Sequence, residues 1–358
     1  MVEEIWHGGD LAEARALFPQ APEPWIDLST GINPIPYPLP ALPLSLWQRL
    51  PGGEEEAALL AAARAAYRVP PDAEIVAAPG TQILIELLPR LLGEGPVAVL
   101  GPTYAEHEAA FRREGLTVET VTRPQDAGPA RILVLVNPNN PDGRVVALCE
   151  LAGWARRLAA RDGWLIVDEA FCDFSPEASL IPSLPARTLV LRSFGKSYGL
   201  AGLRLGFAIG DPGLVARLRA ALGPWAVAGP ALRIGAEALA DRPWLERAAQ
   251  DRAADAARLD ALLAPHGTIL GGTSLFRLLG CVEAPGLFAH LGRHGIYVRR
   301  FQHRPGLLRF GLPAGEEPWR RLGQALACFA GAPAPAARQH APDAGTHRPA
   351  PANLPTET

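Results

Sequence analysis

A chain of 358 residues is long enough for one large domain or two closely packed ones. Hydrophobic residues make up 48% and charged residues 20%, with a net charge of −3, which excludes a largely disordered chain and a strongly basic nucleic-acid-binding protein. The four cysteines form no metal-ligand pattern, so we expect no metal. No apolar run approaches the ~20 residues of a membrane span, and the acidic N-terminus lacks a signal-peptide layout. We therefore expect a cytoplasmic protein whose partner is a small molecule.

The first 48 residues are rich in proline and lack long periodic runs. They predict an arm that packs on the body of the protein and joins part of a small domain.

Between residues 49 and 225, short apolar runs alternate with helical patterns. Strands are predicted at 75–78, 97–100, 116–121, 132–136, 165–167, 188–191 and 205–209. Helices are predicted at 54–67, 83–92, 104–114, 148–160 and 212–222. This alternation predicts a large α/β domain with a mostly parallel sheet.

Residues 226–331 predict a smaller α+β domain. Helices are expected at 230–240 and 243–263, and strands within 268–279, at 296–300 and at 307–311. Residues 332–358 are rich in proline and alanine, and we expect them to form a disordered tail.

Lys196 lies among small residues in the segment from Ser193 to Gly206, just after a predicted strand. A desolvated lysine can lose its proton and attack a carbonyl carbon, and Ser193 and Arg204 are suited to hold an anion beside it. From this segment alone, a glycine-rich turn with exposed cations is an equal alternative.

A second anion site is predicted at Gly80, Thr81 and Gln82, where a strand passes into a helix. The alternative there is an ordinary helix cap made by Thr81. Ligands of parallel sheets bind beyond the carboxyl ends of the strands, so this site and Lys196 are expected to share one crevice.

Three further side chains follow apolar runs at the same predicted edge. Asp168 can pair with a protonated ring nitrogen or cap a turn, and Asn140 can bond a ring oxygen or form an Asx-turn. Tyr104 can stack on a flat ring or pack in the core. An amine, a ring partner, a stacking face and two anion sites together match pyridoxal 5′-phosphate.

The motifs occur in the order Gly-Thr-Gln, Asn-Pro-Asn-Asn-Pro, Asp-Glu-Ala-Phe and Ser-Phe-Gly-Lys, followed by Gly-Leu-Arg-Leu-Gly. This order resembles the class I/II aminotransferase family of fold type I over nearly the whole chain. Within it, the chain resembles the threonine-phosphate decarboxylases of cobalamin biosynthesis, and next the histidinol-phosphate aminotransferases. The first likeness rests on residues 7–10, 27–34 and 298–313 and on Phe171, where most relatives have tyrosine.

The resemblance implies a fold type I architecture, with a large cofactor-binding domain of the seven-stranded type, and a role for each motif. Lys196 binds pyridoxal 5′-phosphate covalently, Asp168 pairs with its ring nitrogen, and Asn140 and Tyr104 contact its ring. The cofactor phosphate is held by the remaining set: Gly80, Thr81, Gln82, Ser193 and Arg204.

For the substrate, the resemblance implies that Arg309 binds the α-carboxylate. The other candidate substrate contacts are His7, Gly31, Ile32, Asn33, Asn140 and Arg299. A homodimer with its active site near the subunit interface is also implied. The tyrosine-proline with which a partner subunit often contacts the cofactor phosphate is replaced here by Leu50-Pro51, and Arg49 is a possible substitute.

The activity implied is decarboxylation of L-threonine O-3-phosphate to (R)-1-amino-2-propanol O-2-phosphate and CO2. A histidinol-phosphate or related aminotransferase is the second hypothesis. The third is a non-catalytic binding protein of the same fold, which an intact Lys196 disfavours.

Overall fold

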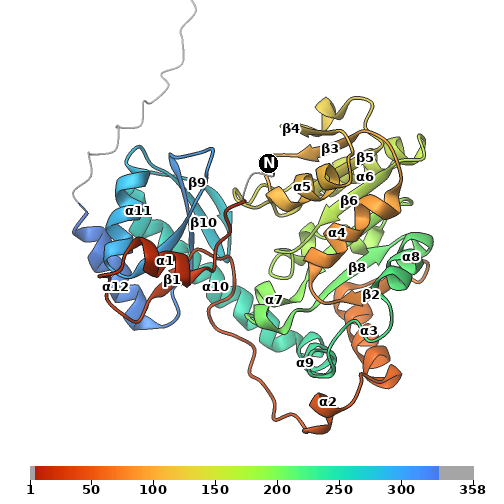
Figure 1. The fold of residues 1–358 in the computed structure, drawn as a ribbon, viewed down its shortest axis with the longest axis horizontal. Helices are drawn as coiled ribbons and strands as arrows, with labels where there is room; N and C mark the ends of the chain where they lie inside the picture. Colours follow the sequence, from red (N-terminus) through yellow and green to blue (C-terminus); the bar gives the residue numbers. More distant parts are fainter. Residues whose placement is uncertain (1–4, 330–358) are drawn as a thin grey trace, which may run out of the picture.

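The computed structural model describes residues 5–329, and its strands form two sheets (Figure 1). The larger sheet has the order β2-β8-β7-β6-β5-β3-β4. Its strands are β2 (Glu74–Ala78), β3 (Val97–Leu100), β4 (Val118–Val121), β5 (Ile132–Val136), β6 (Trp164–Asp168), β7 (Thr188–Ser193) and β8 (Gly206–Gly210).

All strands of this sheet are parallel except β8, which runs antiparallel to both of its neighbours. The predicted mostly parallel α/β sheet is therefore confirmed. Gly206, the first residue of β8, pairs with Ala78 on one side and Ser193 on the other, so β8 begins at the edge where its neighbours end.

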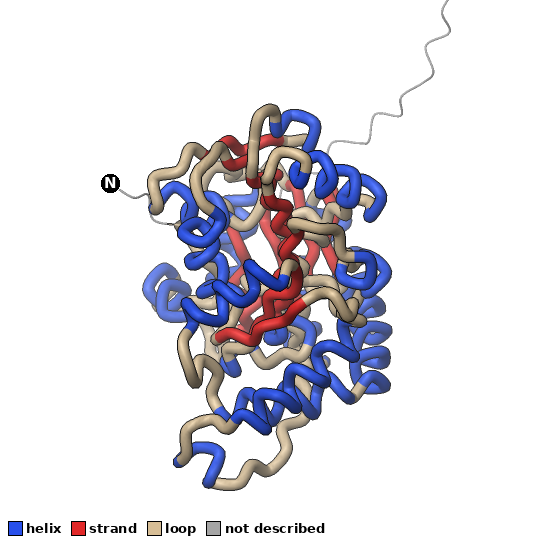
Figure 2. The backbone as a smooth tube through the Cα atoms, turned by 90° about the vertical axis from the view of Figure 1, so that its right-hand side faces the viewer, coloured by secondary structure: helices blue, strands red, loops and turns tan. Residues whose placement is uncertain are grey.

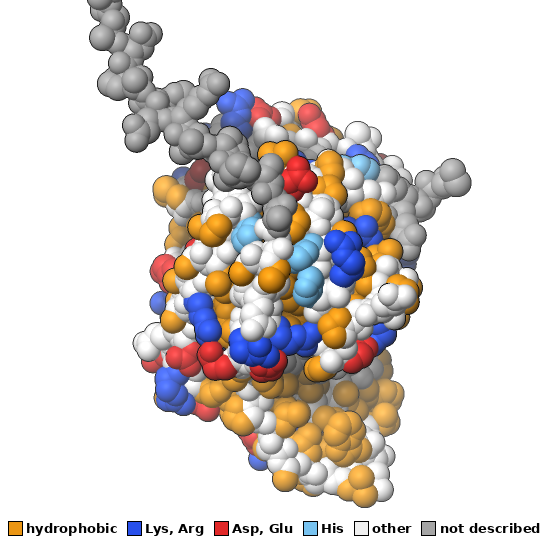
Figure 3. Space-filling view, turned by 90° about the vertical axis from the view of Figure 1, so that its left-hand side faces the viewer, with side chains coloured by type: hydrophobic (Ala, Val, Ile, Leu, Met, Phe, Trp, Pro, Cys, Tyr) orange, Lys and Arg blue, Asp and Glu red, His pale blue; other side chains and the backbone are white. Residues whose placement is uncertain are grey.

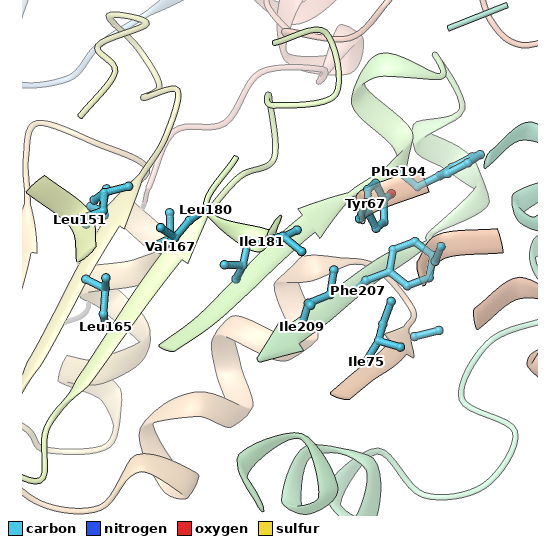
Figure 4. Packing of buried hydrophobic residues seen from close by; sticks show 14 of the residues in the cluster. Tyr67, Ile75, Leu151, Leu165, Val167, Leu180, Ile181, Phe194, Phe207 and Ile209 are labelled. Carbon is cyan, nitrogen blue, oxygen red and sulfur yellow. The ribbon is translucent and has the colours of Figure 1, made fainter. Parts of the chain in front are cut away.

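Helices cover both faces of the large sheet (Figure 2). Along β6, Leu165 and Val167 join one core and Ile166 joins the other, which is the alternation expected of a strand buried on both faces. Figure 4 shows the first of these cores from close by. Its helices are α3 (Gly53–Tyr67), α6 (Leu148–Ala159) and α9 (Gly229–Ala240), and those of the opposite face are α4 (Thr81–Leu92), α5 (Ala105–Arg113) and α8 (Pro212–Leu222).

The smaller sheet has the order β1-β11-β12-β10-β9, with β1 parallel to β11 and the other pairs antiparallel. Its strands are β1 (Ile26–Leu28), β9 (Thr268–Thr273), β10 (Phe276–Gly280), β11 (Ile296–Arg300) and β12 (Leu307–Gly311). The apolar run 268–279 is therefore a hairpin, and its turn at Ser274 and Leu275 carries no glycine or proline to mark it. The helices of this unit are α10 (Arg242–Leu263), α11 (Ala284–Arg293) and α12 (Glu316–Ala327).

The N-terminal arm contains more structure than its sequence predicts. It has two short helices, α1 (Leu11–Leu17) and α2 (Ser45–Gln48), and its strand β1 forms one edge of the smaller sheet. Three residues are too few for a periodic pattern, so β1 becomes a strand only because β11 pairs with it. The remaining short helices are α7 (Phe194–Ser197) and the 3-10 helices Pro124–Ala127, Pro176–Ala178, Ile181–Ser183, Ala201–Leu203 and Ala264–His266.

Helix α9 packs on α3, and its buried residues Ala231, Leu232, Ala238 and Leu239 belong to a core of the large sheet. We therefore propose that the boundary between the two units follows α9 and does not fall at residue 226. The predicted tail, residues 332–358, lies outside the described residues. Within residues 5–329, no helix is long and apolar enough to cross a membrane.

Candidate active site

A cavity of about 190 Å³ opens at the carboxyl edge of the large sheet, where β2, β3, β5, β6 and β7 end and β8 begins. The structure brings together at this cavity all the side chains and backbone segments that the sequence predicts to hold a cofactor. They are Gly80, Thr81, Gln82, Tyr104, Asn140, Asp168, Ser193, Lys196 and Arg204.

Lys196 lies in α7, directly after β7, and is the only lysine in the sequence. Burial lowers the pKa of its amine to about 8, and the positive charge of Arg309 acts in the same direction. Its Nζ lies 5.7 Å from the centre of the Phe171 ring. A lysine with a lowered pKa has a much larger neutral fraction near physiological pH than an ordinary lysine, and the neutral amine is a competent nucleophile.

Asp168 ends β6, and its buried carboxylate is held from two sides. Oδ2 lies 2.9 Å from Nε2 of His107, and Oδ1 accepts a hydrogen bond of 3.0 Å from the backbone N–H of Ala170. His107 is itself buried, on α5, and is not among the residues predicted from the sequence. Its only signal is the spacing of three residues from Tyr104, which places both on one side of the start of α5.

The N-terminus of α4 lies next to the guanidinium of Arg204. Gly80 caps this helix with a φ of 87° and provides no side-chain hydrogen bond, so the first N–H groups of α4 are free of a side-chain cap. A Cβ at Gly80 would lie 2.5 Å from Nη2 of Arg204, which shows how closely the guanidinium approaches the backbone. Both the helix dipole and the guanidinium favour an anion here.

Asn140 and Arg309 hydrogen-bond each other across the cavity wall. Nη1 of Arg309, on β12, donates to Oδ1 of Asn140 at 2.5 Å, and Nη2 donates to the carbonyl of Ser29 at 2.7 Å. Nε of Arg309 is buried without a partner among residues 5–329. Burial lowers the pKa of Arg309 to about 9, and Arg299 contributes to the shift. An unpaired donor on a desolvated guanidinium is suited to a carboxylate.

Tyr104 lines the cavity and donates a hydrogen bond of 3.1 Å from its hydroxyl to Oε1 of Gln82. Burial raises the pKa of this hydroxyl to about 12, and the carboxylate of Glu106 adds to the shift. The ring is therefore held in place through a neutral phenol.

The predicted substrate contacts are distributed unevenly. His7 is exposed, with its ring centre 6.3 Å from that of Tyr104, and Arg299 donates from Nη2 to the carbonyl of Trp6. Gly31 is buried behind Phe171 and Phe276, and a Cβ there would lie 2.8 Å from the Phe276 ring.

Asn33 does not line this cavity. It is 2% exposed, its Nδ2 donates to the carbonyl of Ser197, and its Oδ1 accepts from Arg252. The amide of this side chain joins α10 to the lysine segment. Its neighbour Ile32, like Asn33, lines a separate groove beside β1.

A cluster of buried charges, formed by Arg192, Glu169 and Asp173, lies next to the segment that carries Lys196. Nη1 of Arg192, on β7, donates to Glu169 at 2.9 Å and Nη2 donates to Asp173, while the guanidinium stacks on the Tyr67 ring at 4.5 Å. Burial raises the pKa of both carboxyl groups, and Arg192 opposes that shift. The cluster joins the segment after Asp168 to the strand that carries Lys196.

Residues 49–318 match the family described as Aminotransferase class I and II. The chain belongs to this family. It is 43% identical over 328 residues to the threonine-phosphate decarboxylase of Pseudomonas aeruginosa, an alignment that covers 90% of this chain and 97% of that protein. It is 41% identical over 339 residues to the threonine-phosphate decarboxylase of a Sinorhizobium species, with 91% and 99% covered.

Among solved structures, the fold is similar to that of histidinol-phosphate aminotransferase from Sinorhizobium meliloti in complex with pyridoxal-5′-phosphate. The TM-score is 0.72 at 22% identity, and the match covers 84% of this chain and 89% of that one. The predicted family and its fold type I architecture are thus confirmed.

Proposed function

We propose that this chain is a pyridoxal 5′-phosphate-dependent decarboxylase that converts L-threonine O-3-phosphate to (R)-1-amino-2-propanol O-2-phosphate and CO2. The observation that carries the proposal is the 43% identity to a threonine-phosphate decarboxylase over 97% of that protein. The assembled cavity around Lys196 supplies the chemical support.

The residues at the cavity fit this cofactor. Position 80 has no room for a Cβ beside Arg204, so only glycine fits there. Without a side chain at this position, a phosphate can approach the backbone N–H groups closely. The buried amine of Lys196 has a lowered pKa, and the carboxylate of Asp168 is fixed by His107. When bound, pyridoxal phosphate supplies an electron sink for the electron pair left at the substrate Cα.

We assign each side chain a task at this cofactor. Lys196 binds the aldehyde carbon through Nζ, and Asp168 keeps a proton on the ring nitrogen through its negative charge. The Nδ2 group of Asn140 is available for the ring oxygen because Oδ1 faces Arg309. The phosphate is held by Thr81, Ser193, Arg204 and the first N–H groups of α4.

Arg309 binds the substrate carboxylate and orients the bond that breaks. Because this guanidinium would fix the place of the carboxylate, its position would decide which bond at Cα is oriented for cleavage. The proton that replaces CO2 at Cα would come from Nζ of Lys196, released from the aldehyde carbon by the amine of the substrate, or from a water. Phe171 places an apolar ring against this amine and limits its solvation.

The direct test is to incubate the purified holoenzyme with L-threonine O-3-phosphate and to measure CO2. We expect one CO2 for each (R)-1-amino-2-propanol O-2-phosphate formed, and a Lys196→Ala variant that neither retains the cofactor covalently nor releases CO2. No CO2, together with loss of histidinol phosphate that depends on a keto acid, would establish the aminotransferase instead.

We also propose that the chain forms a homodimer through its N-terminal arm. A set of large apolar side chains near α2 is more than half exposed: Leu39, Leu44, Trp47, Leu50 and Trp225. Figure 3 shows hydrophobic side chains gathered at the lower end of the molecule, where the arm and α2 lie. A patch of this kind is typical of a protein interface.

A further inference from the structure

Glu106 connects the N-terminal arm to the wall of the active-site cavity. It lies on α5 and is only 8% exposed. Its Oε1 is 2.9 Å from Nε2 of His7, while Oε2 is 3.3 Å from Nη2 of Arg113 and 3.4 Å from Nε2 of Gln82. One oxygen therefore faces the arm, and the other faces a residue that lines the cavity.

The arm on either side of His7 is fixed to the smaller sheet. The backbone N–H of Gly9 donates to Oγ of Ser29 at 2.7 Å, and a Cβ at Gly8 would lie 2.3 Å from the Ser29 carbonyl oxygen. On the other side, Arg299 donates to the carbonyl of Trp6, and the guanidinium of Arg300 stacks on the Trp6 ring at 4.5 Å.

The same carbonyl of Ser29 accepts a hydrogen bond from Arg309. The arm at Gly8 therefore packs directly over the contact between Ser29 and Arg309. The contact of His7 with Glu106 then joins this small-sheet assembly to α5 of the large sheet. A lone surface ion pair contributes little, but Glu106 is buried and belongs to a network that reaches Gln82 and, through it, Tyr104.

We propose that Glu106 is a positioning residue that seats His7 beside Tyr104 at the edge of the cavity and thereby favours substrates that carry a second anionic group. The carboxylate holds Nε2 of His7, which leaves Nδ1 as the other polar atom of the ring, and Arg299 donates to the carbonyl of the preceding residue, Trp6. Arg299 is also the cross-strand neighbour of Arg309, so the arm borders the guanidinium proposed to bind the substrate carboxylate. The inference rests on the proposed function because the substrate named there carries a phosphate.

The test is a double-mutant cycle on the holoenzyme with Glu106→Gln, His7→Gln and the double variant. The measurement is the dissociation constant for L-threonine O-3-phosphate, from the change in cofactor absorbance, with L-threonine as the ligand that lacks phosphate. We expect Glu106→Gln to weaken binding of the phosphorylated ligand about tenfold, as loss of a charge-assisted hydrogen bond predicts, and to leave L-threonine binding unchanged. In the His7→Gln background, the second substitution should add nothing.

Glu108→Gln is the matched control, because Glu108 lies on the same helix but pairs with Arg112 and Thr120. It should bind both ligands as the unchanged enzyme does. An equal loss for Glu106→Gln with and without His7 would show that Glu106 merely supports the fold, and would overturn the inference. So would an equal loss of binding for both ligands, or no loss at all.

The proposed function is judged separately by CO2 release from the unchanged enzyme. If no CO2 appears, the same cycle with L-histidinol phosphate still decides the role of Glu106. Failure of the unchanged enzyme to bind either phosphorylated ligand would overturn the inference as well.

Discussion

Lys196 owes its reactivity to its surroundings, and this can be measured without any substrate. Because burial lowers its pKa to about 8, the neutral amine fraction rises as the pH approaches 8 from below and is nearly complete above 9. An ordinary lysine would continue to gain reactivity up to about pH 10.4. We expect acylation of Lys196 in the apoenzyme, followed by mass spectrometry of its peptide, to level off above about pH 9.

Arg309 provides the control for this measurement. Its positive charge helps to lower the pKa of Lys196, so Arg309→Gln should shift the plateau to higher pH. A plateau that stays in place would show that the charge of Arg309 does not contribute to the pKa of Lys196.

His107 should affect cofactor retention although it does not line the cavity. His107→Phe fills a similar volume but removes the group that lies 2.9 Å from Oδ2 of Asp168, and leaves a buried carboxylate with one fewer partner. We expect the His107→Phe holoenzyme to lose its cofactor about tenfold faster during dialysis, with the cofactor absorbance measured over time. His294→Phe, on the exposed end of α11, should retain it normally.

The sequence predicts single residues well where a motif follows a strand end. Four such segments converge because the carboxyl ends of the strands meet at one edge of the sheet. They contain Gly80, Asn140, Asp168 and Lys196. His107 and Glu106 were not predictable in this way. They lie within a helix, and only the packing of α5 turns one toward Asp168 and the other toward the arm.

At the scale of elements, the buried cluster around Arg192 joins β7 to the segment that follows β6. Arg192→Gln would leave two buried carboxylates without their cation, and loss of one partner of such a cluster costs about 3–5 kcal/mol. We expect the free energy of unfolding of the apoenzyme, measured by urea titration, to fall by that amount.

Arg187 is the matched control, because it directly precedes β7 and pairs with Asp162 in an exposed position. Arg187→Gln should cost about 0–1 kcal/mol. Equal effects of the two substitutions would contradict a special role for the buried cluster.

Most elements of the large sheet follow directly from their apolar runs, and β3 and β5 occupy the residues predicted. The smaller sheet is harder to predict because its first strand comes from the arm and its first hairpin lacks a turn signal. The antiparallel direction of β8 is likewise a tertiary property. It depends on pairing with β2 and β7 and leaves no mark on an apolar run of five residues.

At the scale of the whole molecule, the exposed apolar side chains of the arm predict association. We expect a dimer in size-exclusion chromatography with light scattering. Trp47→Glu should weaken it strongly, because a charge would be buried where an indole packs. Val282→Glu, on an apolar side chain that is 82% exposed in the smaller unit, should leave the dimer intact. A monomeric unchanged protein would refute the dimer.

The single lysine has a consequence for how the molecule meets its cofactor in a crowded solution. Of its 34 lysine and arginine residues, all except Lys196 are arginine. The guanidinium of arginine remains protonated and does not condense with aldehydes as an amine does. Apart from the α-amino group at the start of the chain, the protein therefore offers an aldehyde no second amine with which to form a Schiff base. Stray Schiff bases on other side chains are thus excluded by composition, and the side-chain amine available to the cofactor lies in its binding site.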